Sequence, residues 1–350
     1  MVMSNRFRRS LRRTLLFLLL TLAVLVIINR ELVFYGISQA KGQLRIVWGA
    51  RPVDEYLSDP TFPDTLKQKL NLIGEVRSFA IDTLALKDTR NYRTLFDQQG
   101  KEVMWVVTAS EPFRLKPHYW RFPVLGEVPY KGFFEEKAAV DLAADMVRDG
   151  WDVTVRNPGG WSTLGWFTDP ILSEMLEKQE GDLASLIIHE MVHATIFVKD
   201  SVNFNENLAS FIGDRGAEEF LKARFGGQSA EYHTFVNDDH DYFLFVDHVL
   251  RGTRYLDSLY EAIDGHSLIT KLRFKEAMIR RIVNTMDTLS LNSGKKPTRL
   301  FRNRLPNNAY FMSYIHYQSG QDELRREWQE RFNGDLRAYI VFLTGKYPFL

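Results

Sequence analysis

The pattern of apolar and polar positions separates a first half of mixed character from a helical second half. In the first half, apolar residues recur at helical spacing in two segments, and β-branched and aromatic residues mark others as strands. The predicted helices are 63–76 and 134–148, and the predicted strands are 102–109, 119–125 and 151–155. From Leu172 to about Leu343 the pattern predicts helices almost throughout. This segregation favours an α+β fold, with a small mixed β-sheet in the N-terminal half packed on a mostly helical C-terminal half.

The N-terminus places five arginines directly before the apolar run Leu15–Ile28. The run has 14 residues, whereas a full membrane span needs about 20. The possible cleavage site after Ala40 lies 12 residues beyond the run, which favours a retained signal anchor over a cleaved signal peptide. The apolar character of the run on every face and its dense arginines argue against a buried core helix. We therefore expect residues 1–35 to form a cytoplasmic basic tip with a transmembrane signal anchor. Residues 36–350 would then form one exported domain.

Composition narrows the possible functions. Of the 350 residues, 45% are hydrophobic and 25% are charged, which is typical of a globular protein and not of a disordered one. The chain has no cysteine, so disulfides and thiolate metal sites are excluded. Beyond the arginine-rich N-terminus the acidic residues outnumber the basic ones, which argues against a nucleic-acid partner.

The segment Leu183–Val198 is predicted to be an apolar helix, with Asp182 as its N-cap. His189 and His193 are four residues apart, so both lie on one face and can bind one metal ion. Glu190 is adjacent, in position to act as a general base for a water bound to that metal. The alternative is two packed histidines beside a solvated glutamate. Burying three polar residues in so apolar a helix costs free energy unless they have binding partners, and this favours the metal site.

A third protein ligand is expected because catalytic zinc takes three and leaves one position open. The three-histidine metzincin pattern fails, since Lys199 stands where its third histidine would be. Glu206 lies 13 residues past His193, far enough for the chain to return antiparallel in a second helix. The alternatives are Asp200 as the ligand, or Glu206 as a charge that only stabilises a helix start.

Five segments are similar in sequence to the bacterial family of putative zinc aminopeptidases. They are GQLRIVWGARPVDEYL (42–57), YWRFPVLGEVPYKGFF (119–134), STLGWFTDP (162–170), LIIHEMVHATIF (186–197) and FNENLASFIGDRG (204–216). The resemblance implies a gluzincin-like fold and zinc as cofactor, with His189, His193 and Glu206 as metal ligands and Glu190 as base. Gluzincins often carry an Asp four residues after the ligand Glu, where this chain has Ser210. Any carboxylate supporting a ligand histidine must therefore come from elsewhere.

Further residues are candidates for contacts with substrate. Tyr317 follows the Asn307-Asn308-Ala309 block, which also resembles the family, and either Tyr317 or Tyr310 could stabilise an oxyanion. Aromatic packing is the alternative for both tyrosines. The remaining candidates are Asn308 for the substrate backbone, Gly165 and Trp166 on an edge strand at a cleft rim, and Glu127 for a substrate amine. The acidic stretch 238–241 also looks metal-like, but it reads better as a helix start or exposed turn.

Together these features predict a membrane-anchored zinc metallopeptidase, more specifically an aminopeptidase. The resemblance implies an exported bacterial protein. The arginines before the apolar run indicate a single-pass protein of the cell membrane with its catalytic domain on the outer, periplasmic side. Family members are commonly lipid-anchored through a cysteine, so this chain would rely on its N-terminal helix. Its expected partners are a peptide substrate and, through that helix, the membrane. A non-catalytic zinc-stabilised envelope scaffold and a zinc hydrolase of a non-peptide substrate are the alternatives.

Overall fold

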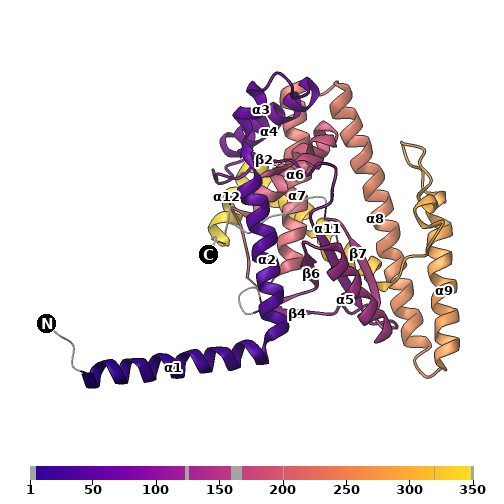
Figure 1. The fold of residues 1–350 in the computed structure, drawn as a ribbon. Coiled ribbons are helices and arrows are strands. Elements are labelled where there is room, and N and C mark those ends of the chain that lie inside the picture. Colours follow the sequence, from indigo (N-terminus) through magenta and orange to yellow (C-terminus); the bar gives the residue numbers. More distant parts are fainter. Residues whose placement is uncertain (1–4, 123–125, 159–167, 200, 319, 348–350) are drawn as a thin grey trace. The chain divides into compact units, whose positions relative to one another are not determined.

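The structure is a computed structural model of the chain, and it describes all residues except 1–4, 123–125, 159–167, 200, 319 and 348–350 (Figure 1). The chain divides into two compact units, Met1–Trp48 and Gly49–Leu350. The domain boundary expected between residues 35 and 36 stays a prediction.

The first unit consists of α1 (Asn5–Ile28) and most of α2 (Arg30–Gly49). None of the helices in the described ranges is long and apolar enough to cross a membrane. Although α1 has 24 residues, arginines occupy its first half and leave only the run Leu15–Ile28 apolar. The predicted transmembrane signal anchor and the single-pass location in a bacterial cell membrane are therefore wrong. The expected membrane contact through the N-terminal helix has no support.

The second unit has the mixed α and β composition that the pattern predicts, but its strands do not form one small mixed sheet. Within the described residues they form three separate sheets, with strand orders β1-β2-β8, β6-β3-β7 and β4-β5. The strands are β1 (Arg51–Pro52), β2 (Thr94–Phe96), β3 (Trp105–Ser110), β4 (Trp120–Phe122), β5 (Gly126–Val128), β6 (Tyr130–Phe133), β7 (Asp152–Arg156) and β8 (Ile171–Leu172).

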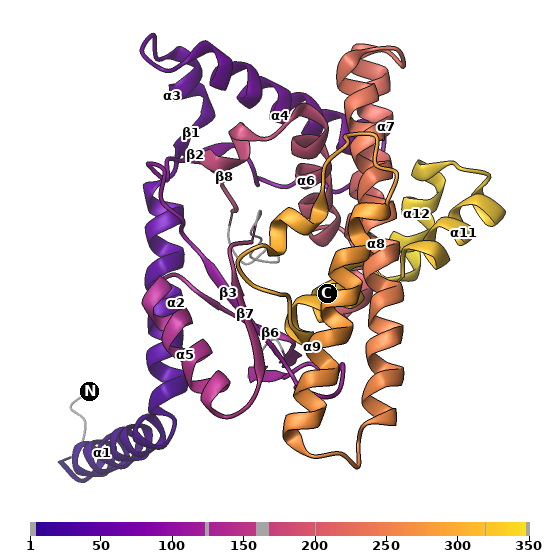
Figure 2. The same cartoon turned by 90° about the vertical axis from the view of Figure 1, so that its right-hand side faces the viewer.

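The pairing of the strands differs from what the sequence pattern predicts. Strand β3 is antiparallel to both β6 and β7, with Val107 opposite Lys131 and Val155. The predicted strand 119–125 was expected beside the strand 102–109, but its residues Trp120–Phe122 form β4, which pairs with the nearby β5. Helix α5 (Glu136–Arg148) packs against the β6-β3-β7 sheet, as Figure 2 shows. Strands β3 and β7 of this sheet also contact the helix formed by Asn308–Gln318.

Helices dominate after Leu172, which confirms the prediction for the second half of the chain. Besides α5 and, earlier in the chain, α3 (Val53–Ser58) and α4 (Asp64–Asp82), the α-helices described in the second unit are α6 (Glu180–His193), α7 (Val202–Phe225), α8 (Ala230–Ala262), α9 (Leu268–Thr285), α10 (Asn308–Gln318), α11 (Gln321–Phe332) and α12 (Leu336–Lys346). Helix α6 packs on α4, α7 and α8, and α7 also contacts α10, α11 and α12.

Helices α6 and α7 approach closely because two glycines of α7 face α6 and the segment after α4. A β-carbon on Gly213 would lie 2.9 Å from the carbonyl oxygen of Ser185 and 3.2 Å from Cβ of His189. A β-carbon on Gly216 would lie 2.9 Å from Cδ1 of Leu84 and 3.1 Å from Cδ1 of Ile188. Because only glycine leaves this space free, the pair of glycines sets the spacing between the two helices.

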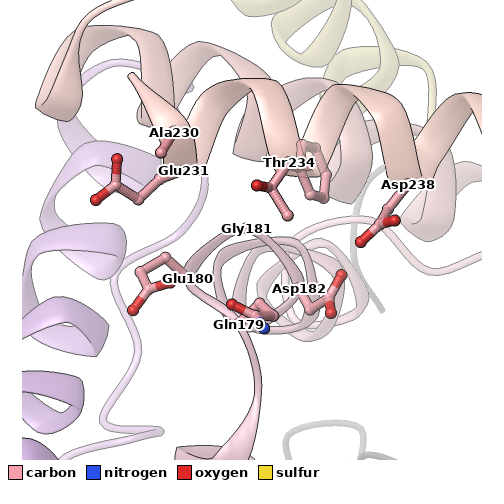
Figure 3. A pocket seen from close by; sticks show the side chains of 9 residues that line it. Gln179, Glu180, Gly181, Asp182, Ala230, Glu231, Thr234 and Asp238 are labelled. Atoms are coloured by element: carbon pink, nitrogen blue, oxygen red, sulfur yellow. The ribbon is translucent and has the colours of Figure 1, made fainter. Parts of the chain in front are cut away.

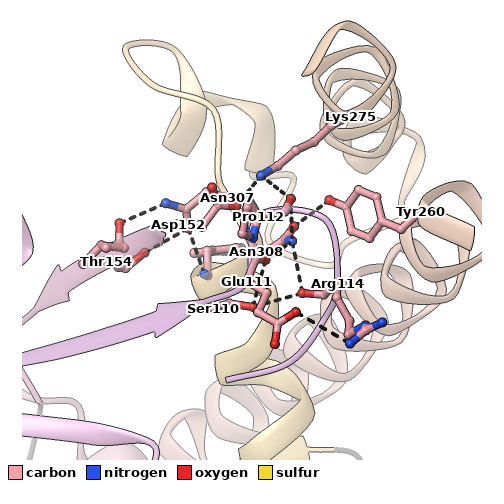
Figure 4. A network of polar contacts seen from close by, with 12 residues as sticks. Ser110, Glu111, Pro112, Arg114, Asp152, Thr154, Tyr260, Lys275, Asn307 and Asn308 are labelled. Carbon is pink, nitrogen blue, oxygen red and sulfur yellow. Dashed lines mark hydrogen bonds and ion pairs between the residues drawn. The ribbon is translucent and has the colours of Figure 1, made fainter. Parts of the chain in front are cut away.

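A buried polar network joins the β6-β3-β7 sheet to the helical half (Figure 4). At its centre, the Asn308 side chain donates to the carbonyl oxygen of Glu111 at 2.8 Å and accepts from the hydroxyl of Tyr260 at 2.7 Å. The backbone N–H of Asn308 donates to Asp152, whose carboxylate also pairs with Lys275 at 2.5 Å. The network therefore fixes the start of α10 against β7 and α9.

Candidate metal centre

The three predicted metal ligands converge where α6 ends and α7 begins. Nε2 of His189 and Nε2 of His193 lie 3.1 Å apart, and each lies 3.6 Å from Oε2 of Glu206. The two imidazoles are nearly perpendicular, with an interplanar angle of 82°. Within the described residues, this is the one group of three His, Cys, Asp or Glu side chains arranged so that it could hold a metal ion.

The separations between these donor atoms fit a tetrahedral zinc site. Zinc binds imidazole nitrogen at about 2.0–2.1 Å and carboxylate oxygen at about 2.0–2.2 Å, which places tetrahedral ligand atoms roughly 3.3 Å apart. The three distances lie on both sides of that value. Two histidines and a carboxylate also leave one position of a tetrahedron open, as a catalytic metal requires.

The two imidazoles of the site favour the charged form of the Glu206 carboxylate. Burial by itself would raise the pKa of Glu206, but the imidazoles of His193 and His189 hold that pKa far below its usual value. For His193, burial lowers the pKa, and the nearby Glu206 and Glu190 carboxylates outweigh burial and raise it. These charges favour the ionised form of Glu206, which is the state that binds a metal.

Glu190 lies on the same helix as both histidines, is only 7% exposed, and precedes the helix end. Helix α6 begins at Glu180 and ends at His193, so the predicted range 183–198 is displaced, and Asp182 is not its N-cap. The hydroxyl of Thr195 donates to the carbonyl oxygen of Met191 and satisfies one group of the last turn. This early stop lets the chain turn back toward α7.

A hydroxyl group lies near the side of His189 that faces away from the other two candidate ligands. The hydroxyl of Ser210 lies 3.5 Å from Nδ1 of His189. One turn further along α7, Asp214 accepts a hydrogen bond from Ser185 of α6 at 2.7 Å. Burial and the charge of Asp239 raise the pKa of Asp214 to about 6. Asp214 is thus a carboxylate near His189 that sequence spacing did not identify.

The asparagines on either side of Glu206 tie its helix to two other segments. Asn205 makes two hydrogen bonds with the backbone of Val198, donating to its carbonyl oxygen at 2.8 Å and accepting from its N–H at 2.9 Å. Asn207 accepts from the N–H of Gly320 at 2.8 Å. Both asparagines are buried. The FNENLAS motif therefore holds Glu206, in the second turn of α7, between two anchors.

Replacing Asn205 by alanine is expected to weaken the metal site without removing a ligand. The change leaves the backbone groups of Val198 without their partner, at a cost of about 2 kcal/mol in the free energy of unfolding. It also loosens the segment that sets the position of Glu206, so zinc affinity should fall roughly 10-fold. Competition with a chromophoric chelator measures the affinity. Asn71→Ala, at an exposed position of α4, is the control and should change neither quantity.

The described structure does not group the remaining predicted site residues with the three candidate metal ligands. Gly165 and Trp166 lie in 159–167, outside the described residues, and so does the side chain of Tyr317. Asn308 is fully buried within the network of Figure 4, so the structure gives it a structural role, and its contact with substrate stays a prediction. Tyr310 bonds with the hydroxyl of Tyr314 at 3.0 Å inside an aromatic cluster.

Glu127 and the acidic stretch 238–241 make contacts that differ from those considered for them in the sequence analysis. Glu127, suggested for a substrate amine, forms an exposed ion pair with Arg121 in the β4-β5 hairpin. The stretch 238–241 lies inside α8 and is neither a helix start nor a turn. Within it, Asp239 pairs with Arg215, and Asp241 accepts from the backbone N–H groups of residues 292 and 293. These carboxylates diverge and do not form a second metal site.

Two cavities lie away from the three ligands. One, of about 160 Å³, lies between the start of α6 and α8, with Glu180 and Glu231 toward one side and Asp182 and Asp238 toward the other (Figure 3). It is at the opposite end of α6 from His193. The other, of about 360 Å³, is lined by residues of α7, α8, α10 and α11 and includes Asp214. Neither cavity is lined by His189, His193 or Glu206.

A His-Glu-x-x-His helix facing a carboxylate on the following helix is the arrangement found in metal-dependent peptidases. A family model described as "putative aminopeptidase" matches residues 34–344. The chain therefore belongs to this family, and that membership supports a peptidase function and a peptide substrate. No curated protein and no solved structure matches the chain, so the expected gluzincin-like fold has no solved structure to support it.

Proposed function

We propose that the protein is a zinc metallopeptidase that removes residues from the free N-terminus of peptides. The observation that carries the proposal is the convergence of His189, His193 and Glu206 at separations of 3.1–3.6 Å. Zinc, when bound there, would lower the pKa of a water molecule and polarise a carbonyl oxygen. The family description supports the choice of a peptide and of its N-terminus.

Glu190 carries the proton transfers in this proposal. Its carboxylate takes a proton from the attacking water and returns it to the leaving amine, as a general base and then a general acid. Its position beside both histidines, shielded from solvent, suits that role. A zinc-stabilised scaffold would need the ligands but no buried carboxylate next to them, so Glu190 favours catalysis over the scaffold alternative.

The test uses the full chain and pairs of peptides that differ only at the N-terminus. The protein is freed of metal with a chelator, given one equivalent of zinc, and assayed on free-amine peptides and on their N-acetylated counterparts. We expect cleavage to depend on zinc and to be confined to free-amine peptides. Equal cleavage of acetylated peptides would show an endopeptidase. A protein that binds one zinc and cleaves neither set would support the scaffold or a non-peptide hydrolase.

A further inference from the structure

The larger cavity, of about 360 Å³, is a groove that follows one face of α8. The α8 residues that line it recur every three or four positions, which places them in one stripe along the helix. They include Asp239, Tyr242, Val246, Leu250 and Arg254. From Asp239 to Arg254 the helix advances about 22 Å. A cavity of this volume spread over that length is narrow, which suits an extended chain of about seven residues better than a helix of about 10–12 Å diameter.

The walls of the groove combine apolar and charged groups from three further helices. Phe211 of α7 and Val246 of α8 line it and are buried. Tyr242 and Phe243 line it with 45% of their surface exposed. The guanidinium of Arg325, on α11, lies 5.7 Å from the centre of the Phe243 ring. The groove therefore offers exposed aromatic surface with a cation beside it, as sites that bind amphipathic ligands do.

Most carboxylates of the groove already have partners. Asp239 and Asp247 each form an ion pair with an arginine. Asp214 accepts a hydrogen bond from Ser185 of α6 at 2.7 Å. Asp322 is the remaining carboxylate among the described residues of the groove, and it lies in the first turn of α11, where the helix dipole favours a negative charge.

Two arginines of the groove, by contrast, are free to pair with a ligand. Arg254 of α8 and Arg325 of α11 are exposed, and neither forms an ion pair within the described part of the chain. Since Arg325 lies at the level of Phe243, the two cations are about 16 Å apart along α8, which is about five residues of an extended chain. Two such cations beside one unpaired carboxylate favour an anionic ligand.

We propose that this groove binds an extended, acidic peptide segment. Tyr242 and Phe243 pack against apolar side chains of the segment, and Arg254 and Arg325 pair with two carboxylates about five positions apart. This binding goes beyond the proposed peptidase function and does not depend on cleavage, because the groove is not lined by His189, His193 or Glu206.

Fluorescence anisotropy on the full-length, metal-free protein tests the binding. The probe is a seven-residue peptide with an amidated C-terminus and a rhodamine dye on its N-terminus. It carries two glutamates five positions apart, with tyrosine and valine between them. We expect it to bind at least tenfold more tightly than matched peptides with glutamine or lysine at the two glutamate positions. Equal binding of the glutamate and glutamine peptides, or tighter binding of the lysine peptide, would overturn the proposal.

Arg254→Gln and Arg325→Gln locate the site. Each change should weaken binding of the glutamate peptide about 5-fold, the effect of losing one exposed ion pair. The double change should weaken it about 25-fold, because the two positions are far enough apart to act independently. Arg280→Gln, at an exposed position of α9 outside the groove, is the matched control and should leave the affinity unchanged.

Full affinity in the double variant would show that the peptide binds elsewhere, and the groove would then not be its site. The assay contains no metal, so its outcome stands whether or not the wild-type protein cleaves peptides. A protein that cleaves no peptide when loaded with zinc would refute the proposed function alone.

Discussion

Replacing Glu190 by glutamine is expected to leave one equivalent of bound zinc and to lower kcat on peptides by about 10²–10⁴-fold, the usual contribution of a general base. Glutamine has nearly the same shape, so His189, His193 and Glu206 keep their separations. What is lost is the carboxylate that accepts the proton. The zinc content is measured by atomic emission, and kcat is measured on free-amine peptides.

The control for Glu190→Gln is Glu177→Gln, which removes a carboxylate from an exposed position shortly before α6. It should retain wild-type zinc content and wild-type kcat. Full peptide cleavage by Glu190→Gln at one equivalent of zinc would contradict the proposed mechanism. Loss of zinc in Glu190→Gln would instead show that Glu190 holds the metal site together.

The buried pair between Lys275 and Asp152 is expected to have the largest effect on stability. Their side chains are 9% and 17% exposed, and Lys275 also donates to the carbonyl oxygen of Pro112 at 2.8 Å. Burial lowers the pKa of Lys275, and only the charge of Asp152 and its hydrogen bond offset that effect. Lys275→Met leaves Asp152 buried without its cation, so the free energy of unfolding should fall by about 3–5 kcal/mol.

Denaturant unfolding followed by tryptophan fluorescence measures this loss. The matched control is Lys137→Met, since Lys137 pairs with Asp141 on the surface of α5 with both side chains largely exposed. Such a pair is worth less than about 1 kcal/mol. The double change Lys275→Met with Asp152→Asn should cost less than the sum of the single changes, because neither charge then stays buried alone. Equal losses for Lys275→Met and Lys137→Met would refute the role of the buried pair.

The sequence predicted best the features that depend on residues close together in the chain. His189 and His193 lie on one face of a helix whatever the rest of the fold is, and Glu206 lies on the next helix. Their meeting could therefore be predicted without knowing how distant parts of the chain pack. Strand pairing was harder to predict from the sequence. The predicted strand 119–125 could pair with β3 or with β5, and in the structure β4 pairs with β5, its neighbour in the chain. For the N-terminus, the error was to let arginines and an apolar run outweigh the shortness of that run.

Residues that act across long sequence separations could not be found from the pattern. Asn91 and Asp169 join two loops that lie 78 residues apart in the sequence, and no local pattern indicates that they meet. Asp214 is joined to α6 by the hydrogen bond that it accepts from Ser185, one turn beyond Ser210. Asn205 was visible in the motif beside Glu206, but its two bonds to Val198 depend on where α6 stops.

The close packing of α6 on α7 has a consequence for the order in which the molecule assembles. All three candidate ligands lie within 189–206, on two consecutive helices, so this hairpin closes a short loop. Contacts of that kind form early in folding, whereas those between the segments near Tyr92 and Asp169 close a much longer loop. A zinc ion captured by the hairpin would then contribute its binding free energy to folding itself. The metal would be a folding cofactor before it is a catalytic one.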